Sequence, residues 1–122
     1  MKITRLVKLS LSEDYLDTFL SSFEKKKQQI LSYEGCLTVD LFLDSTNKGV
    51  CFTVSTWTSE EDLEAYRQSD WFQSTWQEVK QHFTAKPEAW TTHSQETLQN
   101  QKVWANHHLS RFKELPPPIP TQ

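Results

Sequence analysis

The 122-residue chain has only two cysteines and two glycines. Cys36 and Cys51 are isolated from each other and do not show the CxxC-type spacing of a metal site. We therefore expect no bound metal. Both cysteines fall in strand-like segments, and a reducing compartment would keep them as small buried thiols.

Long apolar runs and basic stripes are also absent. No apolar stretch approaches the roughly 20 residues that a membrane helix needs. Charged residues interrupt the N-terminal segment MKITRLVKLSLSEDY before a signal-peptide core can form. The formal net charge is -3, and the best basic cluster, 25–27, is interpreted as a solvated helix face. We expect a cytoplasmic protein that binds neither membranes nor nucleic acid.

Hydrophobic periodicity predicts four strands and two helical regions. Both glycines fit this division, because Gly35 ends the first helix and Gly49 follows a hairpin turn. Ser12 is expected to cap the first helix, and a capping box over 58–61 starts the second region. A second cap at Ser69 breaks that region in two. The predicted strands are 2–10, 36–44, 50–57 and 88–94, and the predicted helical regions are 12–34 and 58–86.

This order predicts an α+β protein with the ferredoxin-like βαββαβ arrangement, a four-stranded antiparallel sheet covered by helices on one face. Phe42 and Trp57 are out of phase with the apolar residues expected on the covered face, and so are expected on the other face of the sheet. They are too apolar to remain exposed to solvent there. We therefore expect a homodimer that buries the two uncovered sheet faces against each other. The residues expected on the helix-covered face are Ile3, Arg5, Val7, Leu9, Leu37, Val39, Leu41, Leu43, Val50, Phe52 and Val54.

The pattern changes near the C-terminus. Residues 1–94 are predicted to form the folded domain, and 95–122 a C-terminal extension. The extension can form a helix over 95–113 and ends in the proline-rich segment LPPPIP. It is either a terminal tail or a docking motif for a partner.

Several motifs resemble the antibiotic biosynthesis monooxygenase family of dimeric α+β barrels. They are ITRLVKL in the first strand, YEGCLTVDLFLD before and in the second, FTVSTWTSEEDLEAYRQSDWF across the third strand and broken helix, and AKPEAW before the last strand. The resemblance implies a pocket in each subunit between the sheet and the broken helix. It also implies oxygenation of a phenolic or quinol-like ring without a flavin, metal or other cofactor.

The resemblance and the residue types indicate candidate site residues. Trp57 ends the third strand, and in relatives the tryptophan at this position often borders the pocket. The Trp57 ring can equally have a structural role. Tyr66 either contacts a ligand or packs in the core. Trp71 closes the pocket mouth or meets the partner subunit, and Trp76 belongs to a core-like stripe with Phe72.

His82 is the candidate for proton transfer, since only histidine titrates near neutrality without help. Its alternative is a surface pair with Glu78. The strand positions at which one relative binds its substrate through asparagine and histidine hold Leu43 and Thr53 here. The positions used by haem-degrading relatives hold Thr4, Tyr66 and Trp76, so an axial histidine is missing and haem degradation is not expected.

We therefore expect a cofactor-independent monooxygenase acting on a small aromatic or quinol-type metabolite. Thr53, Trp57, Tyr66, Trp71 and Trp76 are the expected substrate-binding residues. The alternative is a small-molecule-binding or stress-response barrel that does not turn its ligand over.

Overall fold

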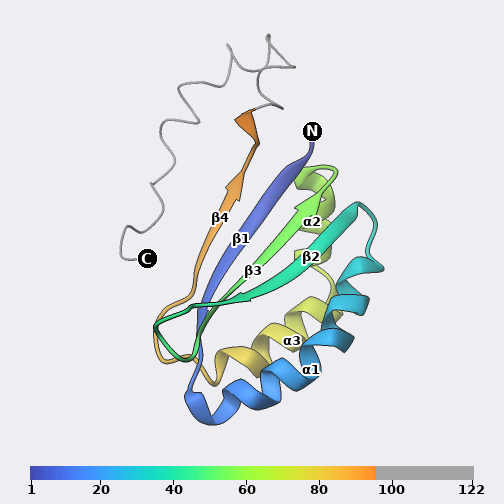
Figure 1. The fold of residues 1–122 in the computed structure, drawn as a ribbon. Coiled ribbons are helices and arrows are strands. Elements are labelled where there is room, and N and C mark those ends of the chain that lie inside the picture. The colour runs from blue at the N-terminus through green and yellow to red at the C-terminus, as the bar shows by residue number, and fades with distance from the viewer. Residues whose placement is uncertain (96–122) are drawn as a thin grey trace. The chain divides into compact units, whose positions relative to one another are not determined.

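The computed structural model describes residues 1–95, of which Met1–Thr92 form one compact unit. Strand β1 pairs with β3 and β4, and β3 also pairs with β2, all antiparallel, giving the sheet order β2-β3-β1-β4. Figure 1 shows the helices on one face of this sheet. The elements are β1 (Ile3–Ser10), α1 (Glu13–Leu31), β2 (Cys36–Leu43), β3 (Val50–Trp57), α2 (Glu60–Arg67), α3 (Asp70–Lys80) and β4 (Glu88–Thr92).

The predicted fold is confirmed: this is a ferredoxin-like α+β domain with a four-stranded antiparallel sheet. Gly35 and Gly49 have φ angles of 85° and 93°, a left-handed conformation in which a side chain would be strained. Ser12 lies at the start of α1 as predicted, but its side chain makes no capping hydrogen bond.

The pairing of β3 with β1 decides which face of β3 meets the helices. Ile3 lies opposite Trp57 and Leu9 opposite Cys51, and all four side chains are almost fully buried. Trp57 therefore points toward the helices, and its predicted place on the uncovered face is wrong. The residues expected in the core instead alternate onto the uncovered face: Val50, Phe52 and Val54.

Strand β2 contributes less to the core than its sequence suggests. Val39 is buried, but Leu37 and Leu43, predicted to share its face in the core, are exposed. The register between β2 and β3 shifts between Cys36 and Thr38, which leaves Leu37 at a bulge. Leu43 is the last residue of this edge strand, where nothing in the described part of the chain covers it fully.

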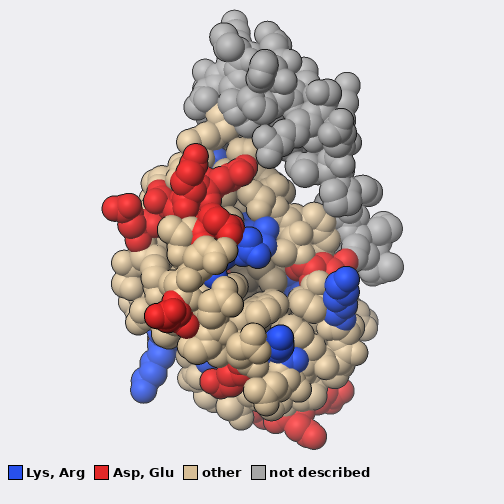
Figure 2. Space-filling model, turned by 180° about the vertical axis from the view of Figure 1, so that it is seen from behind, with Lys and Arg blue, Asp and Glu red and all other residues tan. Residues whose placement is uncertain are grey.

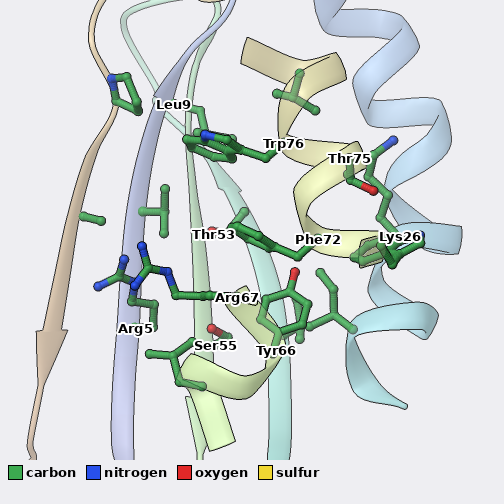
Figure 3. Close-up of a pocket in the computed structure, with 18 of the residues that line it drawn as sticks. Arg5, Leu9, Lys26, Thr53, Ser55, Tyr66, Arg67, Phe72, Thr75 and Trp76 are labelled. Carbon is green, nitrogen blue, oxygen red and sulfur yellow. The ribbon is translucent and has the colours of Figure 1, made fainter. Parts of the chain in front are cut away.

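The second helical region is broken where the sequence indicates. Ser59 accepts a hydrogen bond from the Asp62 N–H and caps α2, one residue later than predicted. Ser69 accepts one from the Phe72 N–H and caps α3, as predicted. The break turns α3 relative to α2, and side chains from both helices then face the same part of the sheet (Figure 3).

The uncovered face of the sheet carries apolar side chains on β2 and β3. Phe42 of β2 is opposite Phe52 of β3, and 55% of the Phe42 surface is exposed. None of the helices within residues 1–95 is both long and apolar enough to cross a membrane. The predicted helix over 95–113 and the proline-rich segment lie outside the described residues, apart from Gln95.

Candidate functional site

A cavity of about 430 Å³ lies between the sheet and the helices. Its volume is within the range of about 300–1,000 Å³ that is usual for small-molecule sites. Figure 2 shows the surface hollowed near the middle of the view, with Lys and Arg side chains close to the hollow. The cavity is therefore accessible to a ligand from solvent.

One wall of the cavity is the helix-facing side of the sheet. Strand β1 contributes Arg5, Val7 and Leu9, and β3 contributes Thr53 and Ser55. The side chains from β3 are small and polar, which leaves room in front of the sheet. The Ser55 hydroxyl accepts a hydrogen bond from the indole N–H of Trp57 at 3.0 Å.

The opposite wall is built from aromatic rings of the broken helix. Phe72 and Trp76 stack with centroids 5.9 Å apart and planes inclined by 10°. Tyr66 meets Phe72 edge-on at 5.0 Å, and Trp71 also lines the cavity. Figure 3 shows Tyr66, Phe72 and Trp76 projecting from the helices toward the strands. A flat ring can pack between this wall and the sheet.

Tyr66 supplies a proton donor rather than a base. The residue is 9% exposed, and burial raises the pKa of its phenol well above the ordinary value of 10.0, with smaller contributions from Tyr33 and Cys36. Its hydroxyl therefore stays protonated throughout the neutral range. It can donate a hydrogen bond to a ligand oxygen.

One end of the cavity is cationic. The guanidinium groups of Arg5 and Arg67 lie next to each other there (Figure 3). Arg5 donates to the Thr91 hydroxyl at 2.9 Å, and Arg67 donates to Glu64 at 3.0 Å. Burial lowers the pKa of the Arg5 guanidinium, and the positive charge of Arg67 lowers it further. Both remain charged at neutral pH.

Lys26 of α1 adds a third cation to the lining. Its ammonium group donates to the Ser22 hydroxyl at 2.7 Å and lies 5.8 Å from the centre of the Phe19 ring. The expected solvated face over 25–27 is therefore only partly correct, because Lys26 is half-buried against the cavity.

Four of the predicted substrate-binding residues line this cavity together: Thr53, Tyr66, Trp71 and Trp76. Trp57 is not in the lining. It is fully buried behind Tyr66, with ring centroids 5.1 Å apart, and packs with Ile3 and Leu63. Its side chain supports the wall rather than forming it.

His82 is also outside the cavity lining. Its ring stacks on Tyr15 of α1, with centroids 3.7 Å apart and planes inclined by 3°. The predicted neighbour Glu78 acts on Tyr15: burial raises the pKa of the Tyr15 phenol, and the charge of Glu78 raises it further. No part of this arrangement brings the His82 imidazole to the cavity.

Sequence reasoning missed Arg5 and Arg67 as site residues, although both carried a signal. Arg5 is in phase with Ile3 and Leu9 on the face that helices cover, where an unpaired charge is costly. Arg67 follows Leu63 by four residues and so shares its helix face. A cation in phase with core residues is a useful indicator of a polar cavity.

Within residues 1–95, no group of three or more His, Cys, Asp or Glu side chains is arranged to hold a metal ion. Cys36 and Cys51 are both free thiols. Burial raises the pKa of each to about 11, so neither is a thiolate near neutral pH.

The fold and cavity define a ferredoxin-like α+β protein with an aromatic-walled cavity between the sheet and the helices. The model of the antibiotic biosynthesis monooxygenase family matches residues 2–78, and the chain belongs to this family. The resemblance found in the sequence is thereby confirmed. No curated protein matches the chain.

Solved structures share the fold at low sequence identity. A conserved protein from Methanosarcina mazei Go1 is 16% identical, with 78% of this chain and 94% of the other aligned and a TM-score of 0.72. A structure described as antibiotic biosynthesis monooxygenase is 14% identical, with 75% and 97% aligned and a TM-score of 0.69. A conserved protein of unknown function from Bacteroides thetaiotaomicron VPI-5482 is 22% identical, with 74% and 96% aligned and a TM-score of 0.64.

Proposed function

We propose that this protein is a cofactor-independent monooxygenase that oxidises a small aromatic or quinol-type metabolite with dioxygen. The observation that carries the proposal is the cavity of about 430 Å³ between an aromatic wall and a small, polar sheet wall. Family membership supports the reaction class.

In this proposal the ring of the substrate packs against Phe72 and Trp76. Tyr66, held protonated by its burial, donates a hydrogen bond to a substrate oxygen. Thr53 and Ser55 offer hydroxyl groups from the sheet side. These contacts fix one orientation of a flat molecule, which is the main requirement when the protein supplies no redox group of its own.

The reaction balances with dioxygen as the only oxidant. A phenol-type ring loses its hydroxyl proton, and the resulting anion passes electrons to dioxygen. The ring also loses the hydrogen of the carbon that is attacked. One oxygen atom enters the ring as a carbonyl and the other leaves as water, so a phenol and dioxygen give a quinone and water. No external reductant is required.

Oxygen uptake tests the proposal. Hydroxynaphthalenes and hydroxyanthracenes are supplied to the full chain, and we expect dioxygen consumption above background, with one quinone formed per dioxygen. The variant Val7→Phe places a large side chain in the cavity and should abolish the uptake. The variant Tyr66→Phe keeps the ring but loses the donor, and should weaken substrate binding by about 0.5–1.5 kcal/mol.

A barrel that binds a small molecule without turning it over is the second candidate, and the placement of His82 outside the cavity favours it. The two functions give different results in the same experiment. Probes that quench tryptophan fluorescence of the wild-type protein, but not of Val7→Phe, without consuming dioxygen would reject the monooxygenase and support the binding protein.

The functional unit in this proposal is a cytoplasmic homodimer formed through the uncovered sheet faces. The apolar pair Phe42 and Phe52 lies on that face, and a second copy presents the same residues. Two such faces can bury each other around a two-fold axis.

A further inference from the structure

We infer that the pocket binds its aromatic ligand in an anionic form, with Arg5 and Arg67 together holding the negatively charged oxygen. This inference rests on the proposed function for the location of the ring and adds the charge that the ligand must carry. The anionic oxygen belongs to a ring carboxylate or to an ionised ring hydroxyl.

The first argument is the charge balance at the cationic end. Two guanidinium groups lie side by side and line the same cavity (Figure 3). Within residues 1–95, Arg67 forms an ion pair with Glu64, whereas Arg5 has no carboxylate within ion-pair distance. Glu64 is the carboxylate whose field reaches both cations. One negative charge against two positive charges leaves the pair with a net positive charge.

The second argument is the position of Arg5. It occupies a half-buried place on a central strand, in phase with the core residues Ile3 and Leu9. Its guanidinium donates a hydrogen bond to the neutral Thr91 hydroxyl. A cation next to another cation in such a place is unfavourable until an anion binds there, and the planar fork of a guanidinium suits an oxyanion.

The third argument is the relation of this end to the aromatic wall. Tyr66 is adjacent to Arg67 on α2, and Ser55 is opposite Arg5 on the paired strand β3. A flat ring against Phe72 therefore has two cations and the Ser55 hydroxyl at one end. Such a site distinguishes one end of a ligand from the other, and so determines which ring carbon is presented to dioxygen.

A matched pair of probes tests the inference for carboxylates. Anthracene-2-carboxylate and anthracene-2-carboxamide have nearly the same shape, and binding of either is followed through the fluorescence of the pocket tryptophans. We expect the carboxylate to bind at least about tenfold more tightly at low salt, because its hydrogen bonds are charge-assisted. Added salt should weaken the binding of the carboxylate and leave the binding of the carboxamide unchanged.

An ionisable probe tests whether the anionic oxygen is an ionised ring hydroxyl. The visible absorption of 2-hydroxyanthraquinone reports its ionisation, and a pocket that prefers the phenolate lowers the pKa of the bound probe. A preference for the carboxylate or a lowered probe pKa supports the inference and names the anion. Equal binding of the two anthracenes together with an unchanged probe pKa would overturn it.

The variants Arg5→Gln and Arg67→Gln should each remove most of the preference for the carboxylate over the carboxamide. The matched control is Lys80→Gln, which deletes one positive charge from an exposed position outside the cavity lining and should keep the full preference. If Arg5→Gln does not fold, Arg67→Gln and the salt dependence of the wild type still decide the matter. A failure of oxygen uptake would reject the monooxygenase and leave this binding result untouched, so the two proposals fail separately.

Discussion

The rings of Tyr15 and His82 stack face to face, with centroids 3.7 Å apart and planes inclined by 3°. The backbone carbonyl of His82 also accepts a hydrogen bond from the Ser12 N–H at 2.8 Å. His82 thus joins the residues after α3 to the start of α1. The cavity lining does not include it.

The variant His82→Phe should therefore retain ligand binding and oxygen uptake, because an aromatic ring can preserve the stack. The variant His82→Ala should lower the free energy of unfolding by about 1 kcal/mol, the usual contribution of an aromatic pair. Urea denaturation and oxygen uptake provide the two measurements. Loss of uptake in a stably folded His82→Phe protein would restore His82 as a proton-transfer residue.

Trp57 should behave as a core residue. It is fully buried, and its indole N–H donates to Ser55. Trp57→Ala should cost about 3–5 kcal/mol of stability. Trp71→Ala, in the half-buried cavity wall, should cost less stability and weaken ring binding by about 0.5–1.5 kcal/mol. The same stability loss in both variants would contradict this division.

The misplacement of Trp57 in the sequence analysis has a physical cause. Strand β3 carries apolar residues in both phases, so a period of two predicts a strand but cannot choose its inner face. The choice is made by pairing: Thr53 lies opposite Val7, and Ser55 opposite Arg5. Small polar residues face the helices because the cavity is there, and the apolar Phe52 faces away.

The sequence predicts the fold more completely than it predicts the site. Turns at Gly35 and Gly49 and the cap at Ser69 are local signals, and each appears in the structure. The cationic end joins Arg5 and Arg67, which are far apart in the chain. Their meeting depends on the approach of α2 to β1, which no local pattern encodes.

The buried thiols should make stability fall at high pH. In the unfolded chain a thiol ionises near 9.0, whereas burial in the fold raises the pKa of Cys51 to about 11. Between these values the unfolded state releases a proton that the folded state keeps. The stabilising contribution is therefore complete below pH 9.0 and is lost as the pH rises toward about 11.

Urea denaturation at a series of pH values measures this effect. The free energy of unfolding of the wild type should decline from pH 9.0 to about 11, and the decline should be smaller in Cys51→Ala. Cys36 has a pKa raised in the same way, so the double variant with Cys36→Ala should decline least. If the free energy of unfolding declines with pH equally in all three proteins, the thiols ionise equally in the folded and unfolded states.

The uncovered sheet face should hold the homodimer together. Phe42 is 55% exposed and paired with Phe52 across β2 and β3. A carboxylate at this position would be buried without a partner in a face-to-face dimer, which is strongly unfavourable. Phe42→Asp should therefore give monomers in light scattering after size-exclusion chromatography, at concentrations where the wild type is dimeric. The matched control Gln77→Asp adds the same charge to an exposed position of α3 and should leave the dimer intact. A wild-type protein that elutes as a monomer at all concentrations would exclude this interface.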